Sequence, residues 1–148
     1  MNSPAPPEKE ITELLIVSLT PQNLERGVLW FKENFSVVKR ARDTNAWWKT
    51  NSIFFDKNGV YKISEVAKLL LELGYERTST IRGKGLYAVR GGIIEIWPIN
   101  TEKPYLIEFS GNLIVLIKER PESEEIIKPR KFLSADDLSK LVDGSLVV

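Results

Sequence analysis

The sequence predicts an α+β fold, in which an antiparallel β-meander packs against one helix and a small βαβ-like unit precedes both. Apolar residues recur at helical spacing over residues 64–73, and Gly74 follows where a helix would stop. After Gly74 the apolar period changes to two, with short runs separated by Gly, Asn and Pro. The stretch 85–98 then has the pattern of a strand, a Gly-Gly break, a second strand and a Pro stop.

Composition favours a globular chain of one domain, or of one domain with part of a neighbour. The 148 residues are 43% hydrophobic and 28% charged, and the net charge of +1 provides no bulk attraction to nucleic acid or membranes. The longest apolar runs are too short to span a bilayer, and residues 1–10 are polar and Pro-rich rather than signal-like. A cytoplasmic location without a membrane partner is therefore expected.

The residue types argue against an enzyme. The chain has no Cys and no His, which excludes thiol and imidazole catalysis and nearly all zinc sites. The run 83–85 lacks the second half of a phosphate-binding loop and precedes a strand. Glu95 and Glu108 could approach each other on adjacent strands, as glycosidase carboxylates do, but pairing with Arg explains them better. We expect no catalytic residue, cofactor, metal or small-molecule substrate.

The polar, Pro-rich composition of residues 1–10 predicts a flexible tail, and residues 11–58 are expected to form a partial α/β segment. In that segment, 13–18 is apolar enough for a buried strand. Thr20 and Pro21 predict a helix start, because Thr caps free N–H groups and Pro lacks the N–H that would be unsatisfied there. One face of this helix carries apolar side chains at helical spacing, namely Leu24, Val28, Phe31 and Phe35.

The rest of the α/β segment predicts more strands. Residues 35–38 predict a strand that would complete a parallel βαβ layer with the first. Residues 42–51 show no clear period and predict a loop. The runs 53–55 and 60–63 flank Asp56-Lys-Asn-Gly59, and Asn-Gly is a signal for a hairpin turn between them.

Residues 59–120 predict the meander domain. Ser64 is the expected cap of its helix, and the stripe Val66, Leu69, Leu70 and Leu73 is expected in the core. The predicted strands are 75–81, 86–90, 93–97, 105–110 and 113–117. Gly91-Gly92 permits a bulge or a close backbone approach. Alternation over 105–110 places Tyr105, Ile107 and Phe109 on one face and Leu106, Glu108 and Ser110 on the other.

Residues 121–148 predict a charged linker, a short helix over 134–141 and a strand starting at Ser145. The apolar run 145–148 is too short to complete that strand, so a longer polypeptide is expected.

Three blocks, 70–77, 86–98 and 104–111, together resemble the UvrB-interaction domain, the second domain of the excision-repair protein UvrB and of the transcription-repair coupling factor Mfd. The spacing between the blocks also fits, over residues 60–120. The run 143–148 is similar to the strand that begins the polymerase-interacting module of the coupling factor, which favours that protein over UvrB. Residues 11–38 more weakly resemble the end of the preceding α/β domain.

The resemblance implies a non-catalytic module of nucleotide excision and transcription-coupled repair that docks UvrA and meets DNA only indirectly. The contact residues that it implies fall on Arg90, Leu106 and Ser110, with Glu108 on the same strand face. Only Arg90 keeps the family residue, because Leu106 replaces an Arg and Ser110 an aromatic. Losing one such side chain typically costs ~2 kcal/mol of binding.

Two other hypotheses therefore stay open. The chain could be a degenerate structural or spacer domain that has lost UvrA binding. For Arg90 itself, the alternative to docking is an intramolecular salt bridge to Glu95 or Glu108. It could instead bind nucleic acid weakly, because basic residues interleaved with aromatics neutralise phosphates and stack bases. The candidate residues for that function are Arg40, Arg42, Trp47, Trp48, Arg82 and Lys84.

Overall fold

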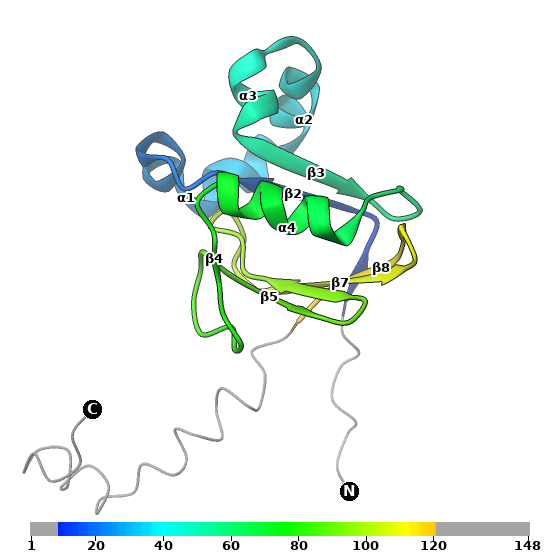
Figure 1. Ribbon diagram of the computed structural model, residues 1–148. Coiled ribbons are helices and arrows are strands. Elements are labelled where there is room, and N and C mark those ends of the chain that lie inside the picture. The colour runs from blue at the N-terminus through cyan, green and yellow to red at the C-terminus, as the bar shows by residue number, and fades with distance from the viewer. Residues whose placement is uncertain (1–8, 121–148) are drawn as a thin grey trace, which may run out of the picture.

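The computed structural model describes residues 9–120 and confirms the α+β class (Figure 1). The described elements are, in chain order, β1 (Glu10–Ile11), β2 (Glu13–Val17), α1 (Pro21–Glu33), α2 (Phe35–Thr44), α3 (Ala46–Thr50), β3 (Ser52–Asp56), α4 (Ile63–Glu72), β4 (Glu76–Arg77), β5 (Leu86–Arg90), β6 (Ile93–Ile96), β7 (Tyr105–Ser110) and β8 (Leu113–Glu119).

Two sheets organise these elements. The larger sheet has the order β1-β8-β7-β6-β5-β4, and its β5–β8 strands form the antiparallel meander that the sequence predicts. The smaller sheet is the antiparallel pair β2–β3. Figure 1 shows α4 and the β2–β3 pair on the same side of the larger sheet, with α2 and α3 beyond β3. None of the described helices covers the face of the larger sheet away from α4.

The main core lies between the larger sheet, α4 and one face of β2–β3. Its fully buried side chains include Leu70 of α4, Ile16 of β2, Phe55 of β3 and Ile107 of β7. These residues come from both sequence segments that flank Gly59. Burial of their apolar surface therefore stabilises both segments together.

A second core covers the opposite face of β2–β3. Leu15 and Val17 of β2 pack there with Phe31 of α1 and Val38 of α2. Because both faces of β2 are buried, the strand carries a continuous apolar run instead of alternating with polar residues. The predicted buried strand at residues 13–18 is confirmed in this form.

The predicted strand at 35–38 and the parallel βαβ layer are wrong. Residues 35–44 form α2, and β2 pairs with β3 in antiparallel fashion. Phe35 and Val38 are three positions apart, which places both against the second core from one helix face. This packing outweighs the strand preference of the two consecutive Val residues.

The predicted loop at 42–51 is also wrong, because α2 continues to Thr44 and α3 follows. The side chain of Asn45 accepts hydrogen bonds from the backbone N–H groups of Trp47 at 2.9 Å and Trp48 at 3.2 Å. An Asn cap can thus start a new helix one residue after the last, in a segment too short to show an apolar period.

Helix α1 starts as predicted but does not keep one apolar face. Thr20 accepts a hydrogen bond from the N–H of Asn23 at 3.4 Å, and Pro21 occupies the first turn. Gly27 adopts φ +79°, which interrupts the helix. Phe31 is buried beyond the break, whereas Leu24 before it is 56% exposed.

Helix α4 ends as predicted but starts two residues earlier than predicted. The N–H groups of Gly74 and Tyr75 return to the carbonyls of Leu71 at 3.0 Å and Leu70 at 2.9 Å, with Gly74 at φ +97°. The cap residue is Lys62 rather than Ser64. Within the predicted stripe Val66, Leu70 and Leu73 are buried, but Leu69 is 42% exposed and lies at its margin.

The predicted hairpin between 53–55 and 60–63 is wrong in its pairing. A turn forms at Asp56–Gly59, with Asn58 at φ +74°, but the chain then runs beside β8. The N–H of Ile114 donates to the carbonyl of Gly59 at 2.9 Å, and Val60 bridges Leu113. The strand predicted at 75–81 shrinks to β4, which pairs parallel to β5.

Residues 1–8 of the predicted tail and the predicted linker, helix and strand of 121–148 lie outside the described residues. The end of the predicted tail is wrong, because Glu10 belongs to β1 and pairs with Lys118 of β8. In the part of the chain that the structure does describe, none of the helices has the length and apolar content needed to cross a bilayer. The predicted domain boundaries stay predictions.

Candidate functional site

The site that the sequence singles out lies on the face of the larger sheet that points away from α4. We call this the outer face, and within β5–β7 it carries Arg90, Ile93, Glu95, Leu106, Glu108 and Ser110. The opposite face of the same strands carries the buried Tyr87, Ile94, Ile96, Ile107 and Phe109. The alternation predicted for β7 is confirmed, since Ile107 and Phe109 are buried and Ser110 is exposed.

Arg90 is presented at the tip of a two-residue hairpin. It ends β5 and pairs in register with Ile93, so Gly91 and Gly92 form the connection. Gly91 adopts φ +56°, and a Cβ on Gly92 would lie 2.9 Å from the carbonyl oxygen of Phe109. The predicted close backbone approach is therefore present, and it ties the hairpin to β7.

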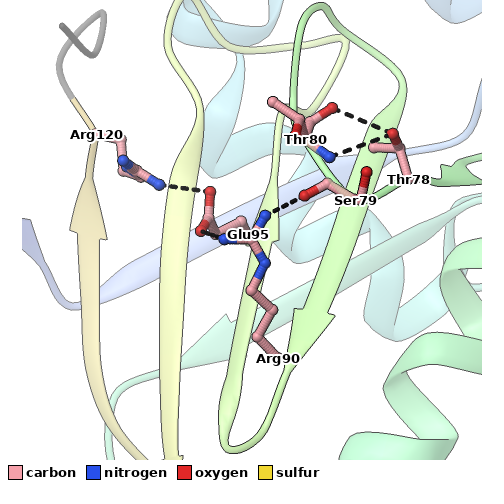
Figure 2. A network of polar contacts seen from close by, with 6 residues as sticks. All are labelled: Thr78, Ser79, Thr80, Arg90, Glu95 and Arg120. Atoms are coloured by element: carbon pink, nitrogen blue, oxygen red, sulfur yellow. Dashed lines mark hydrogen bonds and ion pairs between the residues drawn. The ribbon is translucent and has the colours of Figure 1, made fainter. Parts of the chain in front are cut away.

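A polar network runs across the outer face from β5 to the end of β8 (Figure 2). Its centre is Glu95, whose side chain is only 14% exposed. One carboxylate oxygen of Glu95 lies 2.5 Å from Nη1 of Arg120, and the other lies 3.8 Å from Nη1 of Arg90. Nη2 of Arg90 donates a hydrogen bond to the carbonyl of Ser79. Glu95 is thus held between two guanidinium groups.

The two arginines differ in what they can offer to another molecule. The Arg120 side chain is 25% exposed, whereas the Arg90 side chain is 60% exposed. At 3.8 Å, the pair of Arg90 with Glu95 is an electrostatic contact rather than a hydrogen bond. Arg90 is therefore oriented by Ser79 and Glu95 while part of its donor fork faces solvent.

The remaining predicted contact residues share this face. Leu106 lies opposite Glu95 on one side and Lys118 on the other. Glu108 lies on the same row as Arg90, with Ile93 between them. Ser110 ends β7 next to the hairpin tip. The structure thus brings Arg90, Leu106, Glu108 and Ser110 together on one face.

The predicted nucleic-acid residues are not brought together. Arg82 and Lys84 lie in the loop between β4 and β5, whereas Arg40, Arg42, Trp47 and Trp48 lie in α2 and α3 at the opposite end of Figure 1. Nε of Arg42 donates to the Ser52 hydroxyl at 2.7 Å, so this guanidinium is engaged within the fold. Trp47 is 38% exposed, and Arg40 is also exposed.

Two groups of functional interest are not among the sequence-predicted residues. Arg120 supplies a cation to the outer face from a position that the sequence places at the edge of a charged linker. Arg26 lies over the rings of Trp30 and Trp48, at 4.7 Å and 5.0 Å from their centroids. Arg26 and Trp30 are four residues apart, but the break at Gly27 lies between them, so helical spacing in the sequence does not place them together.

A groove of about 370 Å³ lies away from the outer face, between α1, β2 and the start of β7. Its lining mixes apolar residues such as Phe31 with Lys32, Lys103 and Glu119. Burial and then the Glu119 carboxylate raise the pKa of Tyr105 here to about 12, which keeps this phenol neutral. Among the described residues, no group of three acidic side chains is assembled that could hold a metal ion.

Comparison with known proteins gives a family match. A model of the UvrB interaction domain matches residues 53–133, more than half of the chain. The transcription-repair-coupling factor of Bacillus subtilis is 34% identical over 73 residues, which are 49% of this chain and 6% of that protein. The UvrABC system protein B of Treponema denticola is 33% identical over 88 residues, which are 59% of this chain and 13% of that protein. The chain thus spans less than a seventh of either relative.

Proposed function

Because this chain belongs to the UvrB interaction domain family, we propose that it is a docking module of nucleotide excision repair that binds a UvrA-like protein through its outer face. The matched domain is an interaction domain rather than a catalytic one. The relatives are a coupling factor and a UvrB protein, so the coarser assignment to DNA repair follows from the family. The choice of partner and of contact residues is our proposal.

The observation that carries the proposal is the presentation of Arg90. Its guanidinium is exposed, placed at a hairpin tip and oriented by Ser79 and Glu95. Such a fork can bind a partner carboxylate in bidentate geometry, and pre-orientation lowers the entropy lost on binding. The alternative in which Arg90 is consumed by an intramolecular salt bridge fits less well with a 3.8 Å separation and 60% exposure.

Arg120 offers a physical reason why the loss of a family cation at Leu106 need not remove binding. Leu106 is the register partner of Glu95, and Arg120 reaches that same Glu95 from the end of β8. Arg120 therefore places a guanidinium in the region of Leu106, the position at which this sequence lacks the family Arg. Leu106 itself adds apolar surface beside the two charges, which suits the mixed character of an interface centre.

The experiment is a calorimetric titration of a bacterial UvrA with the full 148-residue chain, which measures the binding affinity. Arg90→Ala should weaken binding by roughly thirtyfold, as expected for an interface Arg. Arg40→Ala is the matched control, because it removes an exposed Arg from α2 on the other side of β2–β3. It should leave the affinity unchanged.

Absence of any UvrA binding by the unmodified chain would refute the proposal and leave the spacer hypothesis. Equal weakening by Arg90→Ala and Arg40→Ala would show that net charge, and not the outer face, determines association. Arg120→Ala should weaken binding less than Arg90→Ala, since Arg120 is less exposed and acts partly through Glu95.

A further inference from the structure

Three of the four tryptophans gather on one surface of the helical layer that covers the second core. Trp30 comes from α1, and Trp47 and Trp48 come from α3. Together with Arg26 we call these residues the aromatic site. The match to the family model begins at residue 53, so the site lies outside it. The β2–β3 pair separates these helices from the larger sheet.

The aromatic site is built around two nearly parallel indoles. The rings of Trp30 and Trp48 are 10° from parallel, with their centroids 6.5 Å apart. Buried Phe31 meets both rings edge-on, and Trp47 supports Trp48 edge-on at 4.9 Å. These edge contacts fix the orientation of the two rings before any ligand arrives.

A flat cation already occupies the ring faces. The guanidinium of Arg26 lies within 5.0 Å of both centroids, and its Nη1 donates to the side-chain carbonyl of Asn23 at 3.2 Å. Arg26 is exposed, and among residues 9–120 this weak stacking and one hydrogen bond are what hold it in place. A planar group that stacks better could displace it toward solvent.

The helical layer is also locally basic. Residues 21–51 contain six Lys or Arg and three Asp or Glu, a net charge of +3 in a chain whose total is +1. Exposed Lys49 follows Trp48 directly, and exposed Arg40 lies on the preceding helix.

We propose that the aromatic site binds single-stranded nucleic acid, with a base stacked on Trp30 and Trp48 and the neighbouring phosphates neutralised by Arg26, Lys49 and Arg40. The base replaces the guanidinium on the rings, and the released Arg26 turns to a phosphate. Stacking of this kind tolerates any base, so little sequence preference is expected.

Charge complementarity favours this ligand over a partner arginine or a methylated lysine. Either of those cations would also suit the indole faces, but each would have to approach Arg26 within a segment, residues 21–51, whose formal net charge is +3. A nucleic-acid strand supplies a flat ring for the indoles and anions for the cations. The proposed site keeps Trp47, Trp48 and Arg40 of the predicted residues, adds Arg26 and Trp30, and leaves out Arg42, Arg82 and Lys84.

This inference does not rest on the outer face. The proposed function uses Arg90 on the larger sheet, and the aromatic site lies beyond β2–β3. Loss of one activity should therefore leave the other unchanged.

The test is a titration of the full chain with a fluorescein-labelled oligothymidine of about 20 nucleotides, at about 50 mM salt. Binding should raise the fluorescence anisotropy of the label and quench the intrinsic tryptophan fluorescence. Trp30→Leu should weaken binding roughly 5- to 150-fold, the range for loss of one stacked base. Arg26→Ala should reduce the slope of the logarithm of the binding constant against the logarithm of the salt concentration by about one, because one phosphate contact is lost.

The matched control is the double variant Arg82→Ala, Lys84→Ala, which removes two cations from the far loop and should bind like the unmodified chain. Circular dichroism checks that each variant is folded. If Trp30→Leu does not fold, the proposal is tested by the quenching of tryptophan fluorescence in the unmodified chain and by the salt dependence of binding by Arg26→Ala. Absence of binding, binding without quenching, or equal loss in the far-loop control would overturn the proposal, as would tighter binding of an arginine-rich peptide.

Discussion

The hydroxyl of Tyr75 donates a hydrogen bond to the carbonyl of Val17 at 2.8 Å, across 58 positions of sequence. The same oxygen accepts a hydrogen bond from the N–H of Ile99 at 3.1 Å. Nearby, the side chain of Asn100 hydrogen-bonds to the backbone of β2, as a neighbouring strand would. The N–H of Val17 donates to its side-chain oxygen, and its side-chain amide donates to the carbonyl of Leu15. The residues that follow α4 and β6 thus satisfy the edge of β2.

Replacing Tyr75 with Phe should therefore destabilise the whole fold. The substitution leaves a carbonyl and an N–H buried without their partner, and each such group costs about 1–3 kcal/mol. We expect a loss of about 2–4 kcal/mol in the free energy of unfolding by urea. Tyr61→Phe is the control, because Tyr61 is less buried and its hydroxyl donates to the carbonyl of Phe54, seven residues away, at 3.1 Å. Equal losses in the two variants would contradict the bridging role of Tyr75.

Alkaline pH should lower stability through the tyrosines. Burial raises the pKa of Tyr105 to about 12, and it also raises the pKa of Tyr75. A phenol with a raised folded-state pKa is fully stabilising below its unfolded value of about 10, and this stability is lost as pH rises through about 12. Urea midpoints should fall over that interval and stay level from about pH 7 to 9. Absorbance at the phenolate band should show the same delay in ionisation.

Gly92→Ala should destabilise the hairpin that presents Arg90. The new Cβ would lie 2.9 Å from the Phe109 carbonyl oxygen, and the backbone of β7 is fixed by a 2.7 Å bond to the Gly92 carbonyl. Overpacking against backbone costs about 1–3 kcal/mol. Gly83→Ala should be nearly neutral, since a Cβ there meets nothing within 4 Å. Thermal melts of the two variants provide the comparison.

Leu70→Ala and Leu71→Ala should differ in their effect on stability, because Leu70 lies on the core face of α4 and Leu71 on its exposed face. Leu70 is fully buried, so its truncation should cost about 2–5 kcal/mol. Leu71 is 57% exposed, and its loss should change stability by about 0.5 kcal/mol or less. Chemical unfolding measures both. A large loss for Leu71→Ala would mean that this face of α4 packs in a way the structure does not show.

Glu95→Gln should weaken the network on the outer face. The carboxylate contacts Arg120 at 2.5 Å and Arg90 at 3.8 Å, and a neutral amide loses both charge interactions. We expect about 1–2 kcal/mol less stability, with a smaller difference at high salt. Glu102→Gln, at an exposed site, is the control. A salt-independent loss would point to packing rather than charge.

Periodicity predicted the meander and α4 well, because their local pattern and their tertiary burial agree. In β7 the alternation alone placed Glu108 and Ser110 on the outer face, and Gly74 correctly marked the end of α4. The residues around α2 and α3 were harder. Phe35, Val37 and Val38 favour a strand locally. Packing of Phe35 and Val38 in the second core with Phe31 instead places them on one face of a helix, and Val37 is 51% exposed.

Partners distant in sequence also escaped prediction. The Asn-Gly turn at residue 58 was recognised, but its continuation pairs with Ile114 rather than with Phe55, and local turn chemistry does not choose between them. Similarly, Arg90 was predicted as a contact residue, whereas the reach of Arg120 to Glu95 depends on the order of β6, β7 and β8. A tertiary neighbour of this kind has no local sequence signal.

The pairing of β1 with β8 has a mechanical consequence. Lys9 and Glu119 stand at the same end of this short antiparallel ladder, where the carbonyl of Lys9 accepts the N–H of Glu119 at 2.7 Å. Tension applied through residues 9 and 120 would load these bonds one after another, as in opening a zipper, instead of shearing them together. The first strand should consequently peel away at low force while the sheet behind it remains intact.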